Sequence, residues 1–375
     1  MRLWLANVRF LAAKELRSLM KDTVLVFLIL FAFTVAIGLV AEGVKAEVSN
    51  ATVGVIDNDR SDLSLRLRDA IRPPYFKPPI DLPRDRVERE MDAGRTIFVI
   101  EFPPRFQADV LAGRSPDVQL LVDATAMTQA GLGASYMQQI FAGETLEFLH
   151  ARGLLGAVPV RVSSHIRFNP NATSSWYTAV MQIVTNVTVL AIILVGAAVI
   201  REREHGTIEH LLVMPVRASE IAFAKIIANG LVIHVAALGS LLLVVHGWLG
   251  VPLAGSLLLF STAMAVYLFS VTALGMFMAT LAPSMPQFGL FAVPVYAIAY
   301  LLSGAATPIE SMPPVLQSLA GVLPTTQFVT LSKAILYRGA GIDVIWPQML
   351  AIAGWGSLFV TLAVQRFRAM LARQG

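Results

Sequence analysis

The chain has 375 residues, of which 56% are hydrophobic and only 14% are charged, and its mean hydropathy is +0.67. This composition excludes a disordered chain and an ordinary soluble enzyme. The net charge of +4 does not indicate nucleic-acid binding, because the bases lie beside apolar segments or are balanced by acids. With no cysteine, the chain has no disulfide framework, thiol nucleophile or thiolate metal site.

Residues 1–22 are predicted to form an amphipathic helix that lies on the inner membrane surface. The bases between Arg2 and Lys21 fall on one side of a helical wheel, and Trp4, Val8 and Leu11 fall mostly on the other. Residues 23–41 are the first predicted membrane crossing. The basic leader and the apolar segment are both longer than those of a cleaved secretion signal, which favours a retained helix.

Residues 42–175 regain charge and are predicted to form a soluble α/β domain inserted between the first two crossings. Segments rich in β-branched or aromatic residues predict strands, and capping residues and prolines predict helices between them. The expected strands are residues 52–56, 96–101, 118–122 and 160–168. The expected helices are residues 63–71, 85–93, 106–112 and 127–152, the last of them as a stalk.

The remainder of the chain is predicted to be mostly membrane-embedded. From Ile226 to Ile309 there is no Asp, Glu, Lys or Arg, and a helix needs about 20 residues to cross a hydrocarbon layer. The expected further crossings are residues 176–200, 221–246, 256–281, 287–306 and 346–364. Residues 307–345, bounded by Pro and Gly, are predicted to form two partial helices that dip into the outer leaflet and pack against other crossings.

Six crossings predict a polytopic α-helical membrane protein with both ends on one side. Lys and Arg gather before the first crossing, between the second and third, and in the tail at residues 365–375, which places these parts in the cytoplasm. The inserted domain and residues 307–345 are then outside. Trp176, Trp248 and Trp346 fall at the outer interface, as an aromatic belt requires.

The chemistry that the sequence lacks narrows the function. With Lys225 assigned to the cytoplasmic flank, no acid or base is expected inside a crossing, which disfavours a transporter driven by an ion gradient. There is no G-x-x-x-x-G-K-[ST] phosphate-binding loop, so any energy from ATP must come from a partner. No metal-binding or catalytic motif is present, and the chain is not expected to be an enzyme or to hold a cofactor by itself.

The densest polar cluster of the membrane half lies in residues 201–220, between the second and third crossings. Gly206 can end the second crossing, Thr207 can cap a short helix with Glu209 in its first turn, and Pro215 can end that helix. The result is either a rigid helix on the inner surface or a solvated loop of charged side chains.

The pattern Glu202-Arg-Glu-x-Gly206-Thr-x-Glu209-x-Leu211-Leu-x-x-Pro215 resembles the signature of the ABC-2 family of ABC-transporter permeases. The likeness covers nearly all of the chain. Within the family, the chain resembles one branch, the YhhJ-type inner-membrane permeases of Gram-negative bacteria. Further matching segments are Phe168-Asn-Pro, Ser284-Met-Pro-Gln-Phe-Gly, Pro308-x-Glu310-Ser-Met312-Pro, Pro324-Thr-Thr-x-Phe328 and Ile335-Leu-Tyr-Arg-Gly339.

This resemblance implies the fold of an ABC-2, type V exporter-like permease half in a bacterial inner membrane, with residues 42–175 in the periplasm. It also implies partners: an ABC ATPase subunit that binds ATP and Mg, a second permease half as a homodimer or a related subunit, and a periplasmic membrane-fusion adaptor. Residues 201–220 would be the coupling helix that docks on the ATPase. The implied ATPase-coupling residues are Arg201, Glu202, Arg203, Glu204, Gly206, Thr207, Ile208, Glu209, Leu211, Leu212 and Pro215.

A polar stripe in the second crossing is the candidate translocation path. Gln182 and Asn186 lie four residues apart on one helix face, with Thr185 beside them. The alternative is that they form hydrogen bonds between helices, each worth about 0.6 kcal/mol in a membrane.

The resulting hypothesis is a permease subunit of an ATP-driven exporter of an amphiphilic, drug-like or lipid-like substrate. The alternatives are a gradient-driven or passive transporter, and a membrane-anchored scaffold or sensor whose outer domain binds a ligand or adaptor.

Overall fold

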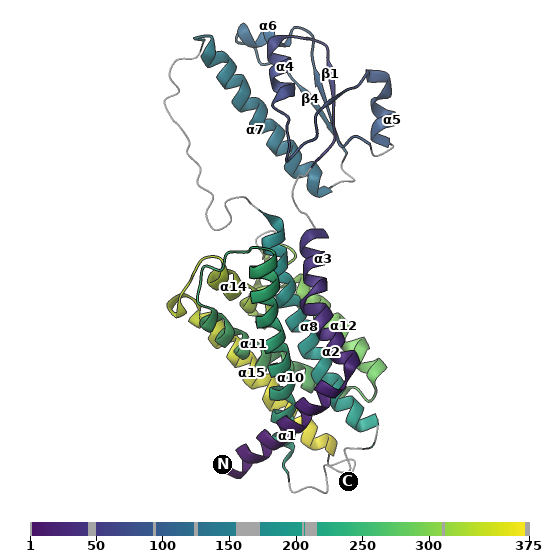
Figure 1. The fold of residues 1–375 in the computed structure, drawn as a ribbon, viewed down its shortest axis with the longest axis vertical. Coiled ribbons are helices and arrows are strands. Elements are labelled where there is room, and N and C mark those ends of the chain that lie inside the picture. Colours follow the sequence, from purple (N-terminus) through teal and green to yellow (C-terminus); the bar gives the residue numbers. More distant parts are fainter. Residues whose placement is uncertain are drawn as a thin grey trace. The chain divides into compact units, whose positions relative to one another are not determined.

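The structure, a computed structural model, describes residues 2–43, 50–92, 95–123, 127–154, 173–204, 206, 216–309 and 312–371. The chain divides into two compact units. The membrane unit contains Met1–Gly43 and Ser175–Gly375, and the inserted unit contains Val44–Ser174. Figure 1 shows the helices of the first unit and the sheet of the second.

The inserted unit contains a four-stranded sheet in the order β2-β1-β3-β4. Strands β1 (Val53–Asp57), β3 (Phe98–Phe102) and β4 (Gln119–Val122) occupy three of the expected strand segments. β1 is parallel to β2 and β3, and β4 is antiparallel to β3. The short strand β2 (Ile80–Asp81) was not predicted, and the strand expected at residues 160–168 lies outside the described residues.

Helices cover both faces of this sheet because its central strands alternate two apolar sets. Val53, Val55, Phe98 and Ile100 share a core with α4 (Asp62–Asp69), α6 (Phe106–Leu111) and α7 (Met127–Ala151). On the other face, Ile56 and Val99 pack with α5 (Val87–Asp92), which follows a short 3-10 turn, η1 (Arg84–Arg86). The alternation of β-branched or aromatic segments with helix-capping residues in the sequence predicts this α/β character.

The long helix α7 is continuous, as expected, but the expectation of a stalk is wrong. Met137, Phe141 and Phe148 of α7 pack against the sheet core, and the Phe102 and Phe141 rings lie 6.0 Å apart. Gly133 has a packing role, because a Cβ there would lie 2.3 Å from the Phe98 ring. The glycine that weakens the helix locally lets α7 approach the sheet closely.

Five helical segments of the membrane unit are long and apolar enough to cross a membrane. They are Thr23–Gly43 (α2, Thr23–Phe33, and α3, Val35–Gly43), Ser174–Glu204 (α8), Ala218–Trp248 (α10, Ala218–Ser240, and the π-helix η2, Leu241–Trp248), Leu257–Leu281 (α11) and Ile342–Met370 within α15 (Ile342–Leu371). Helix α1 (Arg2–Lys21) precedes them, as predicted, and buries Val8, Leu11 and Leu19.

The expected crossing at residues 287–306 is a shorter helix. Helix α12 (Met285–Leu301) has 17 residues, which gives a length of about 26 Å at 1.5 Å per residue. The following residues form α13 (Pro314–Val322) and α14 (Pro324–Leu336), which meet at an 82° bend. This pair is a broken span or a re-entrant loop, in agreement with the two partial helices expected there. Among the described residues there are therefore five candidate spans, or six if the bent pair is counted as one.

Helix α8 is the most deeply buried of the candidate spans and crosses α11 at a glycine. A Cβ at Gly275 of α11 would lie 2.8 Å from the backbone oxygen of Ile192 in α8. The two backbones can approach this closely only because residue 275 has no side chain.

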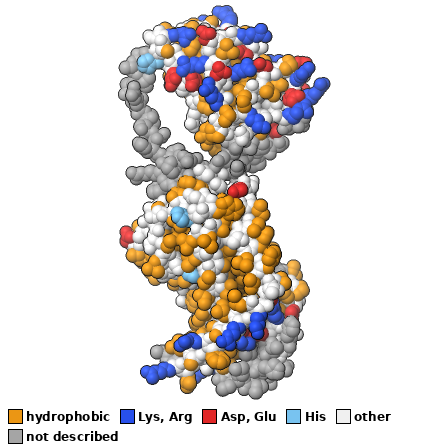
Figure 2. Space-filling view, in the orientation of Figure 1, with side chains coloured by type: hydrophobic (Ala, Val, Ile, Leu, Met, Phe, Trp, Pro, Cys, Tyr) orange, Lys and Arg blue, Asp and Glu red, His pale blue; other side chains and the backbone are white. Residues whose placement is uncertain are grey.

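Helix α1 and the C-terminal end of α15 lie at one end of the membrane unit, where α8 ends at Glu204. Lys14 of α1 lies 3.7 Å from Glu202, and Met370 of α15 contacts Arg203. Figure 2 shows Lys and Arg side chains gathered over α1 at this end and hydrophobic side chains over the rest of this face of the unit. We call this end of the membrane unit, where α1 and the last turn of α8 lie, the α1 end.

We expect Gly275→Ala to destabilise the membrane unit by about 1–3 kcal/mol, because the new methyl group would push α8 and α11 apart. Thermal unfolding of the purified chain in detergent measures this. Gly239→Ala in α10 is the matched control, since a Cβ there meets nothing within 4 Å. Equal unfolding temperatures for the two variants would contradict the role of Gly275.

Candidate functional site

The last turn of α8 is joined to the starts of two other helices. Arg201 donates to the Asp22 carboxylate at 3.0 Å, and Glu204 accepts the backbone N–H of Met285 at 3.0 Å, at the first residue of α12. Asp22 also caps α2 by accepting the backbone N–H of Leu25, and this bond is the main reason that the pKa of Asp22 lies below its ordinary value. Asp22 therefore stays ionised opposite Arg201 at neutral pH.

Arg203 points into the helix bundle. Its guanidinium donates to the backbone carbonyls of Ala279 and Ala282 and contacts Met370. Those carbonyls belong to the end of α11, where a helix leaves unpaired acceptors and a partial negative charge. The resemblance implies that Arg201 and Arg203 help couple an ATPase; in the structure both side chains contact other helices of the same chain.

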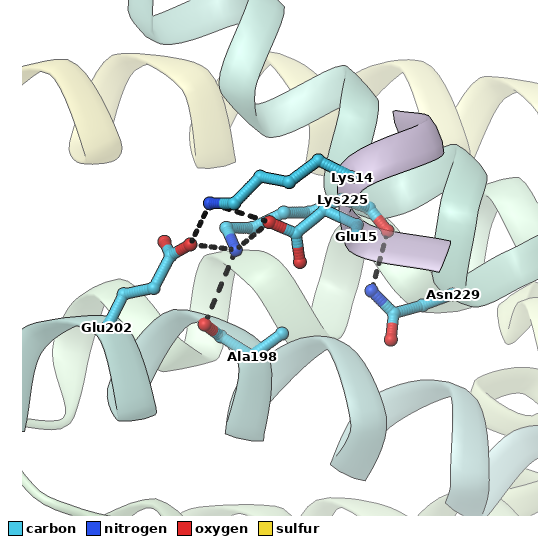
Figure 3. Close-up of polar contacts among 6 residues, drawn as sticks. All are labelled: Lys14, Glu15, Ala198, Glu202, Lys225 and Asn229. Carbon is cyan, nitrogen blue, oxygen red and sulfur yellow. Dashed lines mark hydrogen bonds and ion pairs between the residues drawn. The ribbon is translucent and has the colours of Figure 1, made fainter. Parts of the chain in front are cut away.

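Three helices meet at a buried lysine, Lys225, in the first third of α10 (Figure 3). Its ammonium lies 2.9 Å from Glu202 of α8 and 3.1 Å from Glu15 of α1, and it donates to the Ala198 carbonyl at 3.4 Å. The Lys225 side chain is 1% exposed, and Lys14 lies 3.7 Å from Glu202 on the more open side. We call Lys14, Glu15, Glu202 and Lys225 the Lys225 cluster.

The Lys225 cluster corrects one expectation from the sequence. Lys225 does not lie in a solvated flank: it is a buried charge inside a candidate span. The sequence offered one signal, because Glu15 is an acid among the bases of α1 and lies four helical residues from Leu11 and Leu19, which are buried. Neither Glu15 nor Lys14 was selected as a site residue from that signal.

Two further contacts attach α1 to the start of α10. Asn7 donates to the buried Glu220 carboxylate at 3.2 Å, and Trp4 donates to Ser219 at 3.3 Å. Glu220 also accepts the backbone N–H of Arg217 at 2.7 Å, which closes the first turn of α10. Both contacts lie on the N-terminal side of the Lys225 cluster in each helix, and they hold α1 along the first turn of α10.

The predicted coupling segment connects these two anchored helix ends. His205 and residues 207–215 lie outside the described residues, and with them Thr207, Ile208, Glu209, Leu211, Leu212 and Pro215. Gly206 is described: it follows the end of α8 with φ at +67°, and its N–H donates to the Arg203 carbonyl. Gly206 thus ends α8 in the left-handed conformation that glycine adopts most readily, as the sequence predicts.

The candidate translocation residues form hydrogen bonds within the bundle. Gln182 donates to Asn186 at 3.0 Å, and Asn186 donates to the backbone carbonyl of Ala32 at 2.5 Å. Ala32 lies in the last turn of α2, where the first span is interrupted at Thr34. Thr185 is half-buried on the same helix. These contacts favour bonding between helices for Asn186 and leave Gln182 and Thr185 partly exposed.

Tyr267 is a second buried polar residue that was not selected from the sequence. Tyr267 of α11 shares a hydrogen bond with Thr188 of α8 at 2.7 Å and donates to Thr325 of α14 at 3.3 Å. Its ring stacks on Phe328 with centroids 4.0 Å apart. Beyond it, Tyr337 donates to the Trp176 carbonyl at 2.8 Å. These bonds join the bent pair to α8 and α11.

Comparisons with known proteins agree with this architecture. A family model described as ABC-2 family transporter protein matches residues 21–364. The chain is 47% identical to the inner membrane transport permease YhhJ of Escherichia coli K12, with 97% of each chain covered. It is 27% identical to the probable multidrug ABC transporter permease YbhR of the same organism, with 96% of this chain and 95% of the relative covered. It is 25% identical to the probable multidrug ABC transporter permease YbhS, with 95% of each covered.

We expect Lys225→Met to lower the stability of the membrane unit by about 3–5 kcal/mol, because two largely buried carboxylates then face each other without their shared cation. Thermal unfolding in detergent measures the loss. Adding Glu15→Gln and Glu202→Gln should recover much of it by removing both charges. Lys21→Met, at an exposed position of α1, is the control. A Lys225→Met variant as stable as this control would show that the cluster contributes no stability.

Proposed function

Because the chain belongs to the ABC-2 transporter family, we propose that it is the membrane-spanning permease subunit of an ATP-driven exporter. The energy comes from a separate ABC ATPase subunit, which binds ATP and Mg. The sequence supports a separate ATPase subunit, since this chain has no phosphate-binding loop of the P-loop type.

The observation that carries the proposal is the anchoring of both helix ends that flank residues 205–217. Glu202 at the end of α8 and Lys225 near the start of α10 share a buried ion pair, which also includes Glu15 of α1. A force applied to the segment between them therefore acts on α1, α8 and α10 together. ATP-driven closure of the ATPase would push this segment and shift the second and third crossings.

The substrate that we propose is amphiphilic, drug-like or lipid-like. The candidate path offers amide and hydroxyl groups, at Gln182 and Thr185, on a largely apolar stretch of α8. Two of the relatives are named as probable multidrug permeases, which supports this substrate class.

The proposed assembly has two permease halves, two ATPase subunits and a periplasmic membrane-fusion adaptor. It lies in the bacterial inner membrane, with the α1 end in the cytoplasm and the inserted unit in the periplasm. The position of α1 and the end of α15 at the same end of the bundle is consistent with an even number of crossings.

The coupling role predicts that Glu209→Arg and Gly206→Pro abolish ATP-dependent transport. The first reverses a charge on the docking segment, and the second cannot adopt the positive φ of Gly206. The measurements are co-purification of the ATPase subunit and transport in vesicles that contain the complex. Gly206→Asn is the matched control, since asparagine tolerates the left-handed conformation and a Cβ there lies within 4 Å of no atom of the described residues.

If both disruptive variants assemble with the ATPase and transport as the wild type does, the coupling role is wrong. If transport persists without ATP under an ion gradient, the protein is a gradient-driven transporter.

The proposed orientation can be tested with single cysteines, because the chain has none of its own. We expect Lys77→Cys, at an exposed position of the inserted unit, to react with a membrane-impermeant maleimide in cells with a permeabilised outer membrane. Lys21→Cys, at the end of α1, should react only after the inner membrane is opened. The reverse pattern would place the inserted unit in the cytoplasm and exclude the proposal.

A further inference from the structure

A pocket of about 290 Å³ opens beside the Lys225 cluster, between α1, the start of α2 and the last turns of α8. Lys14 and Arg201 contribute its cations, and Glu15 and Glu202 contribute its carboxylates. Leu25 and Leu194 form part of an apolar wall. One pocket thus combines charges of both signs with a hydrocarbon surface.

The position of this pocket matches the boundary between lipid headgroups and hydrocarbon. Asp22 caps α2, and from Val24 onward this helix is apolar, whereas α1 carries bases along its length. Headgroups meet the hydrocarbon region at such a change from charged to apolar side chains. A ligand here would place a charged group against α1 and a chain against α2 and α8.

The two signs of charge lie at different depths in the pocket. The Lys14 and Arg201 side chains are 57% and 53% exposed, whereas Glu15 and Glu202 are 13% and 15% exposed. Lys14 and the two carboxylates point toward one another in Figure 3. The two cations that line the pocket balance the charge of its two carboxylates. The charges of the neighbouring Lys225 and Asp22 also cancel. A headgroup with no net charge fits this wall better than an anionic one.

We propose that this pocket binds the headgroup of phosphatidylethanolamine from the leaflet at the α1 end. Lys14 and Arg201 contact the lipid phosphate through charge-assisted hydrogen bonds, and the primary ammonium donates to Glu15 or Glu202. One acyl chain lies along Leu25 and Leu194. A quaternary choline cannot donate such a hydrogen bond, and an anionic glycerol headgroup offers the carboxylates no cation. The site depends on the membrane placement of α1 and α2 and is independent of the exported substrate.

Native mass spectrometry of the full-length chain, released from detergent, tests this inference. The probes are phosphatidylethanolamine, phosphatidylcholine and phosphatidylglycerol with identical acyl chains. We expect the ethanolamine lipid to bind about tenfold more tightly than either of the others, a difference equivalent to about 1.4 kcal/mol. Equal binding of the three lipids, or a preference for the choline or glycerol lipid, would overturn the proposal.

Two sets of variants localise the binding. Lys14→Gln with Arg201→Gln should abolish the preference for the ethanolamine lipid, whereas Lys21→Gln with Arg366→Gln, two bases that do not line the pocket, should keep it. Ser18→Phe fills the pocket without changing any charge and should abolish the same preference. Thermal unfolding of each variant shows whether it is folded. If folded Ser18→Phe protein keeps the preference, the lipid binds elsewhere.

Discussion

The ammonium of Lys225 is the interaction on which the α1 end of the membrane unit depends. A lysine buried in a membrane helix is stable only when carboxylates or carbonyls surround it, and here α1 and α8 each supply a carboxylate. The dependence is mutual, because the same ammonium lies within 3.1 Å of both Glu15 and Glu202. One residue on α10 thus helps to position two other helices.

Elsewhere in the bundle, polar side chains donate hydrogen bonds to backbone carbonyls at places where a helix is interrupted or ends. Asn186 bonds the Ala32 carbonyl beside the break between α2 and α3, and Tyr177 donates to the carbonyls of Gly304 and Ala305 after α12. In a membrane such carbonyls have no water to bond, so interrupted helices need partners from their neighbours. The hydroxyls and amides of α8 supply several of these partners, which accounts for its polar residues without requiring that all of them face a substrate.

The sequence predicted the helices well because each is encoded locally. The uncharged segment after Lys225, the Pro residues around residue 313 and the glycine at 206 each act within a turn or two of their own position. The β-branched and aromatic residues of β1 and β3 likewise indicated strands. Strand β2 has two residues and no such pattern, so only its pairing with β1 reveals it.

Long-range partners could not be predicted in the same way. Glu15 and Lys225 are far apart in the sequence, and each alone resembles a residue of a charged membrane flank. Whether Arg201 and Arg203 contact a partner or their own bundle likewise depends on the positions of Asp22 and of the end of α11. Sequence patterns determine which face of a helix is apolar, but the pairing of buried charges follows from how the helices cross.

The close crossing of α8 and α11 at Ile192 and Gly275 has a mechanical consequence. A helix pressed against a neighbour at one point, with backbone touching backbone, turns about that point more readily than it slides along it. Ile192 divides α8 unequally, since the arm toward Trp176 is longer than the arm toward Glu204. If α8 tilts as a rigid rod about this contact, a small displacement at Glu204 produces a larger displacement in the opposite direction at Trp176. Because Tyr337 donates to the Trp176 carbonyl, the bent helix pair then moves with that end of α8.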